Sequence, residues 1–187
     1  MEQEIRNAVE VLRNGGTILY PTDTIWGIGC DATNEKAVNK IFQIKKREEL
    51  KSMIVLVSDE GMLNRFVKDI PALAWDLIEV SDSPITIIYD FGREFAKNLI
   101  AEDGSIAVRL TRDEFCQRLI HKFGKPIVST SANFSGAVAP QNFSEISSDI
   151  ISQVDYVVNW RQDEILQTKA SSIIKLKSNG EFQIIRK

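Results

Sequence analysis

The 187-residue sequence has few of the residues on which many catalytic and extracellular sites depend. Its two cysteines, Cys30 and Cys116, are too few for a disulfide framework and indicate a reducing compartment. Its single histidine, His121, lies among Lys and Arg on a predicted helix, so we expect it to be solvated rather than part of a nucleophilic triad. No group of His, Cys, Asp and Glu has metal-ligand spacing. The sequence therefore predicts no protein-held metal.

Long apolar runs and an excess of positive charge are also absent. No run approaches the roughly 18 residues that cross a bilayer, and the N-terminal segment MEQEIRNAVEVLRNGG lacks the layout of a signal peptide, so we expect a cytoplasmic protein. A net charge of −3 and a pI near 5.3 argue against a general nucleic-acid binder but leave a local basic patch open. There is no Walker-type loop, and GIGCDA lacks the third glycine of a dinucleotide fingerprint.

Helical and strand-like patterns alternate along the chain. Apolar residues at helical spacing predict helices over Glu2–Asn14, Asn34–Ile44, Asp59–Val67, Pro71–Val80, Phe91–Ile100, Arg112–Phe123 and Phe143–Ile150. Short apolar runs predict strands over Thr17–Tyr20, Met53–Val57, Pro84–Tyr89, Ser105–Leu110, Pro126–Thr130, Val154–Asn159, Ser171–Leu176 and Phe182–Arg186. This alternation predicts an α/β fold of the α+β type, with an open, twisted, mixed sheet flanked by helices in one domain, 1–187.

The stretch from Thr17 to Val57 contains the first candidate site. A bend places the side chains of Thr22, Asp23 and Thr24 before two glycines, with Trp26 as either a lid or a packing residue. A basic cluster, predicted just past the end of a helix, follows and consists of Lys45, Lys46, Arg47 and Lys51. Hydroxyls opposite cations indicate a site for a phosphate-bearing ligand. The alternative is a simple turn and a solvated helix end, where cations complement the helix dipole.

Two further features extend this candidate site. Arg109 lies in the apolar run SIAVRL, and because arginine is rarely buried alone, it is either exposed on an edge or paired with an anion. The predicted strand that ends at Thr130 opens into a polar loop, residues 131–142, with Ser131, Asn133 and Gly136. Open α/β sheets bind ligands at such carboxyl ends, and glycine allows backbone amides to approach an anion.

Taken in order, PTDTIWGIG, KKR, SIAVRL, STSANFSG and KASSIIKL resemble the YrdC/TsaC family of threonylcarbamoyl-AMP synthases. The family's Pro-Thr-acid-Thr segment corresponds to residues 21–24, its Lys-x-Arg pair to Lys45 and Arg47, and its Ser-x-Asn triplet to Ser131 and Asn133. The resemblance runs from Glu2 to Arg186 and is closest to the short form of the family. It implies a YrdC-like fold.

The sequence departs from the family pattern at several positions. Glu48 stands where proline usually follows the Lys-x-Arg pair, Ser52-Met53 replaces a Pro-Leu, and Leu56 stands where longer relatives often have histidine. A Pro-Gly-Pro before the middle strand is reduced to residues 82–84, Asp-Ser-Pro. These departures bear on the substrate more than on the fold.

The resemblance implies that L-threonine, bicarbonate and ATP give threonylcarbamoyl-AMP and pyrophosphate for the t6A modification of tRNA. It implies Mg2+ with the ATP, held by phosphate oxygens and water, and downstream t6A transferase proteins as partners. The catalytic residues would be Lys45 and Arg47. L-Threonine would contact Thr24, Arg109, Ser129, Thr130 and Ser172. ATP would contact Arg47, Lys51, Ser105, Ser131, Asn133, Ala139 and Arg186.

Two alternatives stay open. One is an RNA-binding module on the same fold, in which Lys36, Lys40 and the basic cluster contact the phosphates of tRNA or double-stranded RNA. The other is a diverged paralogue that keeps the nucleotide pocket and uses another acyl or carbamoyl substrate, as Glu48 and Leu56 would allow.

Overall fold

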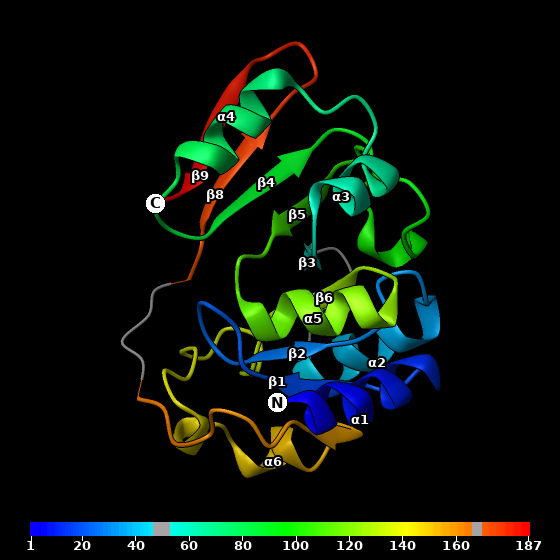
Figure 1. The fold of residues 1–187 in the computed structure, drawn as a ribbon, viewed down its shortest axis with the longest axis vertical. Helices are drawn as coiled ribbons and strands as arrows, with labels where there is room; N and C mark the ends of the chain where they lie inside the picture. The colour runs from blue at the N-terminus through cyan, green and yellow to red at the C-terminus, as the bar shows by residue number, and fades with distance from the viewer. Residues whose placement is uncertain (47–52, 166–169) are drawn as a thin grey trace.

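The computed structural model describes residues 1–46, 53–165 and 170–187. Over these ranges the strands form one mixed sheet in the order β7-β1-β2-β6-β3-β5-β4-β8-β9 (Figure 1). The strands are β1 (Ile18–Tyr20), β2 (Gly27–Gly29), β3 (Ile54–Val57), β4 (Ile85–Tyr89), β5 (Ile106–Leu110), β6 (Ile127–Ser131), β7 (Tyr156–Val157), β8 (Ser172–Leu176) and β9 (Phe182–Arg186). The pairs β1–β7, β3–β5 and β4–β8 are parallel and the others antiparallel, which confirms the predicted mixed sheet.

Helices cover both faces of this sheet and form two cores. The helices are α1 (Glu2–Arg13), α2 (Glu35–Lys45), α3 (Glu60–Phe66), α4 (Ala72–Val80), α5 (Glu114–Phe123) and α6 (Ser148–Ile151). On one face, α1 and α5 pack on Ile18, Tyr20 and Leu56. The other face packs against α2, α3 and α4. None of the helices in the described ranges is long and apolar enough to cross a membrane.

The ends of α2 and α5 follow from their capping residues. The Asn34 side chain accepts hydrogen bonds from the first-turn amides of α2, and Asp113 accepts one from the Cys116 amide of α5. Lys46 ends α2 in the left-handed conformation, with φ of 50°. Lys45 is therefore the last residue of α2 and is buried, so the prediction that it lies just past the helix was wrong.

The short strand β2 was predicted as part of a polar, glycine-bearing bend, and glycine is a poor strand former. In the structure it pairs with β1 on one side and β6 on the other, and its glycines are needed for close packing. A Cβ atom at Gly29 would lie 2.7 Å from the Tyr20 ring and 2.7 Å from the Val128 carbonyl oxygen. Glycine at this position allows the neighbouring strands to approach closely. The strand propensity of glycine does not predict such a contact.

The helix predicted over Phe91–Ile100 was wrong. Only a 3₁₀ turn forms there, at Lys97–Leu99. Its backbone amides bond to distant carbonyls instead of to the preceding turn: Arg93 N–H donates to Phe66 O at 2.7 Å, and Ala96 N–H donates to Ala32 O at 2.9 Å. Tertiary hydrogen bonds thus replace a helix of marginal length. The helix predicted over Phe143–Ile150 is split into a 3₁₀ turn, Phe143–Glu145, and α6.

We predict that Gly29→Ala lowers the free energy of unfolding by about 1–3 kcal/mol, the usual cost of an overpacked interior. Urea unfolding measures this. Gly61→Ala is the matched control, since Gly61 is exposed on the first turn of α3 and a methyl group there would meet only the Asp59 side chain. Equal stability of the two variants would show that the sheet has room at Gly29.

Candidate functional site

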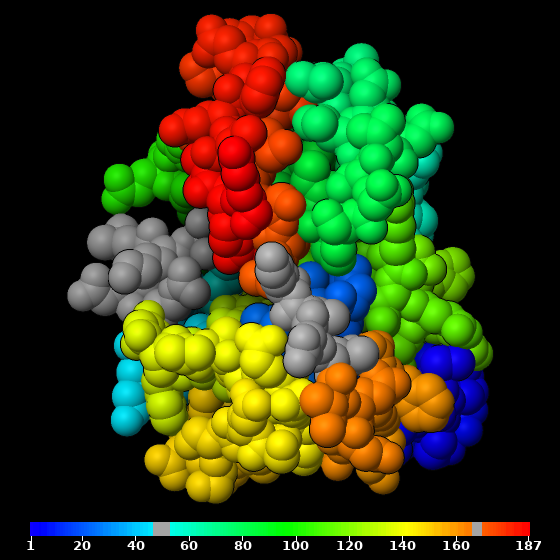
Figure 2. Space-filling model, turned by 90° about the vertical axis from the view of Figure 1, so that its left-hand side faces the viewer, coloured from blue at the N-terminus to red at the C-terminus, as the bar shows by residue number. Residues whose placement is uncertain are grey.

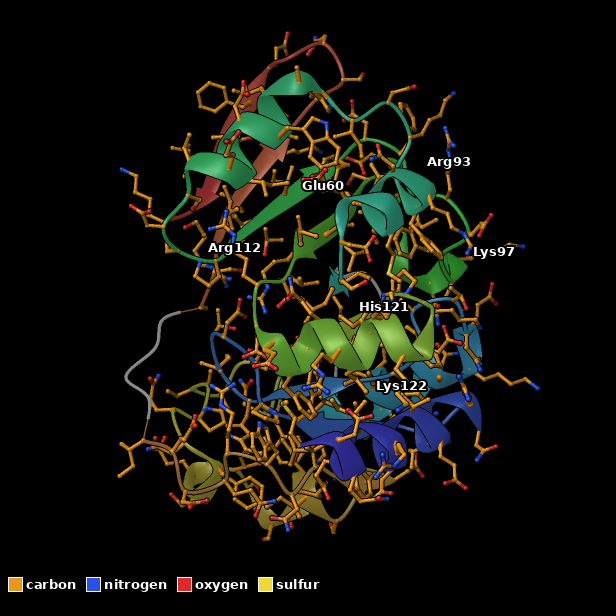
Figure 3. All side chains as sticks on the ribbon, in the orientation of Figure 1. Glu60, Arg93, Lys97, Arg112, His121 and Lys122 are labelled. Atoms are coloured by element: carbon orange, nitrogen blue, oxygen red, sulfur yellow. The ribbon has the colours of Figure 1, made fainter. Side chains whose placement is uncertain are left out.

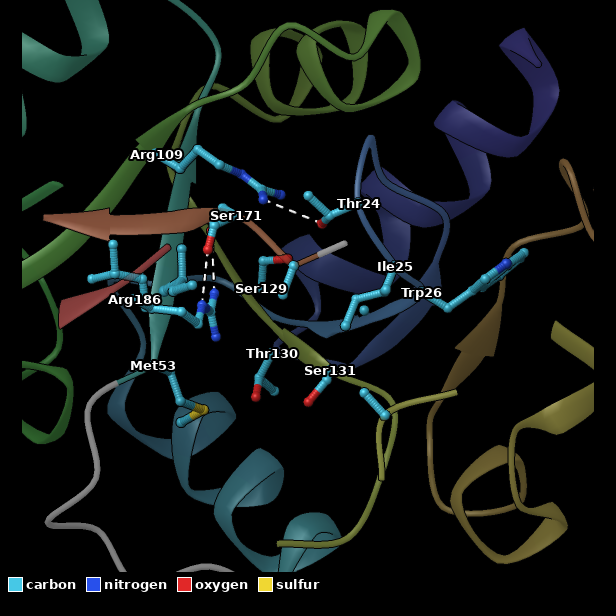
Figure 4. Close-up of a pocket in the computed structure, with 15 residues that line it drawn as sticks. Thr24, Ile25, Trp26, Met53, Arg109, Ser129, Thr130, Ser131, Ser171 and Arg186 are labelled. Carbon is cyan, nitrogen blue, oxygen red and sulfur yellow. Dashed lines mark hydrogen bonds between the residues drawn. The ribbon is translucent and has the colours of Figure 1, made fainter. Parts of the chain in front are cut away.

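A cavity of about 260 Å³ opens where the ends of β3, β6, β8 and β9 meet. Figure 2 views the side of the molecule on which β8 and β9, in orange and red, lie above residues 130–150, in yellow. Figure 4 shows the residues that line the cavity, which are Thr24, Ile25, Trp26, Gly27, Met53, Ile54, Arg109, Ser129, Thr130, Ser131, Ala139, Ala170, Ser171, Ile173 and Arg186. The volume is below the roughly 300–1,000 Å³ typical of pockets for drug-sized ligands, so it suits a molecule of amino-acid size.

Strand pairing explains why these residues meet. Residues directly opposite each other point to the same face of a sheet, and every second residue of a strand shares that face. Ile54 lies opposite Ser129, and Ile173 lies opposite Arg186. Arg109 lies opposite Leu56 and so shares the face of Ile54. Ser129 and Arg109 therefore share the face of Ile54, and Arg186 shares the face of Ile173. Thr130, which alternates with Ser129, instead borders the cavity at the end of β6.

The Arg109 guanidinium is the most constrained group of the site. Its side chain is only 4% exposed, on a strand that lies between β3 and β4. One terminal nitrogen lies 3.1 Å from Asp23 Oδ1, and the other donates to Thr24 Oγ1 at 3.2 Å. Its Nε has no hydrogen-bond acceptor among the described residues. A buried N–H without an acceptor is costly, so the bonding of this guanidinium, which borders the cavity, is incomplete.

Asp23 was identified as part of the polar bend but not as the partner of Arg109. Burial raises the pKa of its carboxyl above the usual value, with Arg109 opposing and Asp113 adding to the increase. The free-energy cost of desolvating the Asp23 carboxylate therefore offsets part of its attraction to Arg109.

A second guanidinium, that of Arg186, faces Arg109 across the cavity. Its Nε donates to the Ser171 carbonyl at 2.9 Å (Figure 4). The Ser171 hydroxyl in turn forms a hydrogen bond with the buried Thr86 hydroxyl at 2.8 Å. Partial burial and the nearby Arg109 charge lower the pKa of Arg186. Among the described residues that line the cavity, the charged ones are these two arginines, and this positive charge favours an anionic ligand.

Lys45 holds the loop after β6 and does not line the cavity. Its Nζ donates to the carbonyls of Ser131 at 2.6 Å and Asn133 at 2.7 Å, and its own carbonyl accepts the Ser135 amide at 3.0 Å. The Asn133 amide group donates to Phe134 O and Ala137 O within the same loop. The KKR and SAN motifs are therefore in contact, through main-chain carbonyls of the loop.

The predicted site residues divide into three groups. Those that line the cavity are Thr24, Arg109, Ser129, Thr130, Ser131, Ala139 and Arg186. Those that lie elsewhere are Lys45, Ser105, Asn133 and Ser172. Arg47 and Lys51 fall outside the described residues.

For two of these residues the structure explains why the side chain does not line the cavity. Ser105 donates its hydroxyl to Asp103 at 2.5 Å at the start of β5. Ser172 alternates with Ser171 and Ile173, so its side chain points to the opposite face. Sequence reasoning missed other lining residues, namely Ile25, Met53, Ile54, Ala170, Ser171 and Ile173. The alternation within KASSIIKL could have indicated Ser171, once the facing of Arg109 was known.

No group of three or more metal-ligating side chains occurs in the described ranges. His121 lies on the outer side of α5 and is exposed (Figure 3), as predicted. Trp26 is 5% exposed and its ring lies 4.9 Å from that of Phe143, so packing against a neighbouring ring accounts for it although it borders the cavity.

Comparison with known proteins gives consistent results. A profile of the Sua5/YciO/YrdC family, described as "Telomere recombination", matches residues 10–187. The chain is 35% identical to a threonylcarbamoyl-AMP synthase of Pseudoalteromonas translucida over 161 residues, which cover 84% of this chain and 86% of the relative. It is 31% identical to a protein of the same name from Photobacterium profundum over 151 residues, 78% of this chain and 80% of the relative.

A solved structure extends the comparison to three dimensions. The crystal structure of P. abyssi Sua5 complexed with L-threonine superposes with a TM-score of 0.83 at 26% sequence identity. The match covers 94% of this chain and 52% of that protein, so the chain spans about half the length of this longer relative.

The raised pKa of Asp23 predicts a pH dependence of stability. The folded state holds the Asp23 proton more tightly than the unfolded chain does. The stability that this group contributes therefore falls as pH rises from about 4 through the raised pKa. Asp23→Asn removes this effect. The unfolding free energy of the variant minus that of the wild type should therefore increase from pH 3 to pH 7.

Urea unfolding across that pH range measures the difference. Asp59→Asn is the control, because hydrogen bonds from Ser58 and Met62 lower the pKa of Asp59, and its difference should decrease with pH instead. If Asp23→Asn followed the same direction as Asp59→Asn, the burial effect at Asp23 would be refuted.

Lys45→Met keeps the length of the side chain and removes its donors. Each lost hydrogen bond from the charged ammonium group is worth roughly 1.5–3 kcal/mol, so we expect faster amide hydrogen exchange over residues 131–135. Lys40→Met, in the same helix, removes a bond to Gly15 O far from this loop and should leave the exchange there unchanged. Unchanged exchange in Lys45→Met would mean that Lys45 does not hold the loop.

Proposed function

The chain belongs to the Sua5/YciO/YrdC family, and we propose that it is a threonylcarbamoyl-AMP synthase. It would convert L-threonine, bicarbonate and ATP into threonylcarbamoyl-AMP, pyrophosphate and water. The relatives from Pseudoalteromonas translucida and Photobacterium profundum carry this name, and the P. abyssi neighbour was solved with L-threonine. The observation that carries the proposal is the buried, incompletely bonded Arg109 guanidinium in a cavity of amino-acid size.

In this proposal Arg109 binds the L-threonine carboxylate. A guanidinium presents paired donors that match the two oxygens of a carboxylate, and such charge-assisted pairs are stronger than neutral hydrogen bonds. Thr24, Ser129 and Thr130 lie at the same cavity and supply hydroxyls for the polar groups of the amino acid. The apolar lining by Ile54 and other residues leaves room for its methyl group.

The nucleotide would lie toward the loop after β6. Ser131 and Ala139 line the cavity beside that loop, Arg186 faces them from the opposite wall, and Lys45 holds the loop from behind. Arg47 and Lys51 are proposed to neutralise the triphosphate. Ser105 and Asn133 stay proposed ATP contacts on the resemblance alone. Mg2+ would travel with ATP on its phosphate oxygens.

The chemistry needs no side-chain nucleophile. The threonine amine adds to the carbon of CO2 derived from bicarbonate and loses a proton, and a carbamate oxygen then attacks the α-phosphate as pyrophosphate leaves. Holding the two reactants in line, with cations around the phosphates, supplies the catalysis. This agrees with the one histidine, His121, lying away from the cavity.

We further propose that the product serves tRNA t6A modification in the cytoplasm, through transferase proteins that accept the adenylate. Binding of tRNA or double-stranded RNA is a separate prediction. It depends on the basic cluster, of which Arg47 and Lys51 lie outside the described residues.

Pyrophosphate release from ATP in bicarbonate buffer, with and without L-threonine, tests the proposed function. We expect release that depends on L-threonine, together with the mass of threonylcarbamoyl-AMP. ATP binding without release under these conditions would favour a paralogue with another substrate, and neither binding nor release would favour the RNA-binding module.

Arg109→Gln should raise the KM for L-threonine by about ten- to a hundredfold, because a hydrogen bond to a charged group contributes about 1.5–3 kcal/mol. Breaking one partner of a buried ion pair can also destabilise the fold, so Asp23→Asn/Arg109→Gln is measured beside it. Arg112→Gln is the matched control, since Arg112 bonds to carbonyls at the end of α4 (Figure 3). An unchanged KM in both Arg109 variants would remove Arg109 from the threonine site.

A further inference from the structure

Thr22 and Thr24 form a buried hydrogen-bonded pair behind the cavity wall. They are 3% and 5% exposed. Their hydroxyl oxygens lie 2.9 Å apart, and the Thr22 hydroxyl also donates to the Ile25 carbonyl at 2.8 Å. The Thr24 amide donates back to Thr22 Oγ1 at 3.0 Å. Only Thr24 of the two lines the cavity beside Arg109.

The number of hydroxyl protons determines which of the two threonines donates the hydrogen bond between them. A carbonyl oxygen can only accept, and the Thr22 hydroxyl is the one donor to Ile25 O among the described hydrogen bonds. The single Thr22 proton therefore points to Ile25. The contact between the two hydroxyls then requires that Thr24 donates to Thr22. With the Thr24 amide, this fills both lone pairs of Thr22 Oγ1.

The consequence for the cavity is that Thr24 Oγ1 is an acceptor only. Its proton is committed to Thr22, and one of its lone pairs takes the Arg109 N–H at 3.2 Å (Figure 4). The other lone pair is left for a ligand donor. Arg109 donates and Thr24 accepts, so the two neighbouring groups form one donor site and one acceptor site.

We propose that Thr22 is a positioning residue, which fixes the Thr24 hydroxyl as an acceptor for an N–H of the amino-acid substrate. This proposal rests on the proposed function. An α-amino acid carries its carboxylate and its amine on one carbon, so the carboxylate at Arg109 brings the amine to Thr24. The amine keeps an N–H through ammonium, free amine and carbamate, so the same acceptor orients it before and after carbon dioxide is added.

Thr22→Val tests this role because it removes the hydroxyl and frees the Thr24 proton to turn toward the cavity, where it would oppose the substrate N–H. We expect the KM for L-threonine to rise about tenfold, the value of roughly one hydrogen bond, while the KM for ATP changes little. Thr22→Ser keeps the hydroxyl and should restore the wild-type KM. Thr33→Val is the control, because Thr33 makes a similar local bond, to Asp31 at 2.7 Å, away from the cavity.

A double-mutant cycle separates this role from simple support of the turn. Thr24→Val removes the acceptor itself and leaves the bond between Thr22 and Ile25 intact. If Thr22 acts through Thr24, the double variant should raise the KM for L-threonine no further than Thr24→Val alone. The proposal would be overturned if the KM increase in the double variant were the product of the two single increases. Equal KM values in Thr22→Val and Thr22→Ser would also overturn it. Wild-type protein without threonine-dependent pyrophosphate release would instead refute the proposed function.

Discussion

The buried guanidinium of Arg109 is the constraint on which the rest of the site depends. A charge inside a sheet costs free energy unless other groups compensate it, and here the compensation is partial: Asp23 supplies a carboxylate and Thr24 supplies one acceptor. The bend between β1 and β2 brings both residues over the strand that carries Arg109. Together with Arg186, this guanidinium gives the described lining of the cavity its positive charge.

Strand packing places the other groups around this charge. Gly27 and Gly29 let β2 lie close to Tyr20 and β6, so that the bend and the serines of β6 border the same cavity. On the opposite wall, Ser171 and Arg186 are joined by a hydrogen bond at the ends of β8 and β9. The loop after β6 is held by Lys45 from α2. The site is thus assembled from most of the chain, which agrees with the family match over residues 10–187.

Much of this arrangement could be predicted from the sequence. Helices with clear apolar stripes and caps, such as α2 and α5, formed close to their predicted bounds because local signals and tertiary packing agree. The failures came where long-range contacts overrule local patterns: β2 needs its neighbours to be a strand, and the segment after Phe91 bonds to distant carbonyls.

The candidate site was predictable to the same extent. Arg109 was expected either to be exposed on an edge or to pair with an anion, and the structure shows the second alternative. Asp23 as that partner, and Ser171 rather than Ser172 at the cavity, depend on strand register and side-chain facing, which a single sequence does not specify. The direction of the bond between Thr22 and Thr24 required the distances themselves.

The most direct test of the central claim is calorimetric binding of L-threonine and of L-threoninol, which replaces the carboxylate by a hydroxymethyl group, in the presence of an ATP analogue with a methylene between the α- and β-phosphates. If Arg109 holds the carboxylate, L-threonine should bind and L-threoninol should bind at least about tenfold more weakly, the loss of a charge-assisted hydrogen bond. Equal affinity for the two molecules would show that the Arg109 guanidinium does not recognise the substrate.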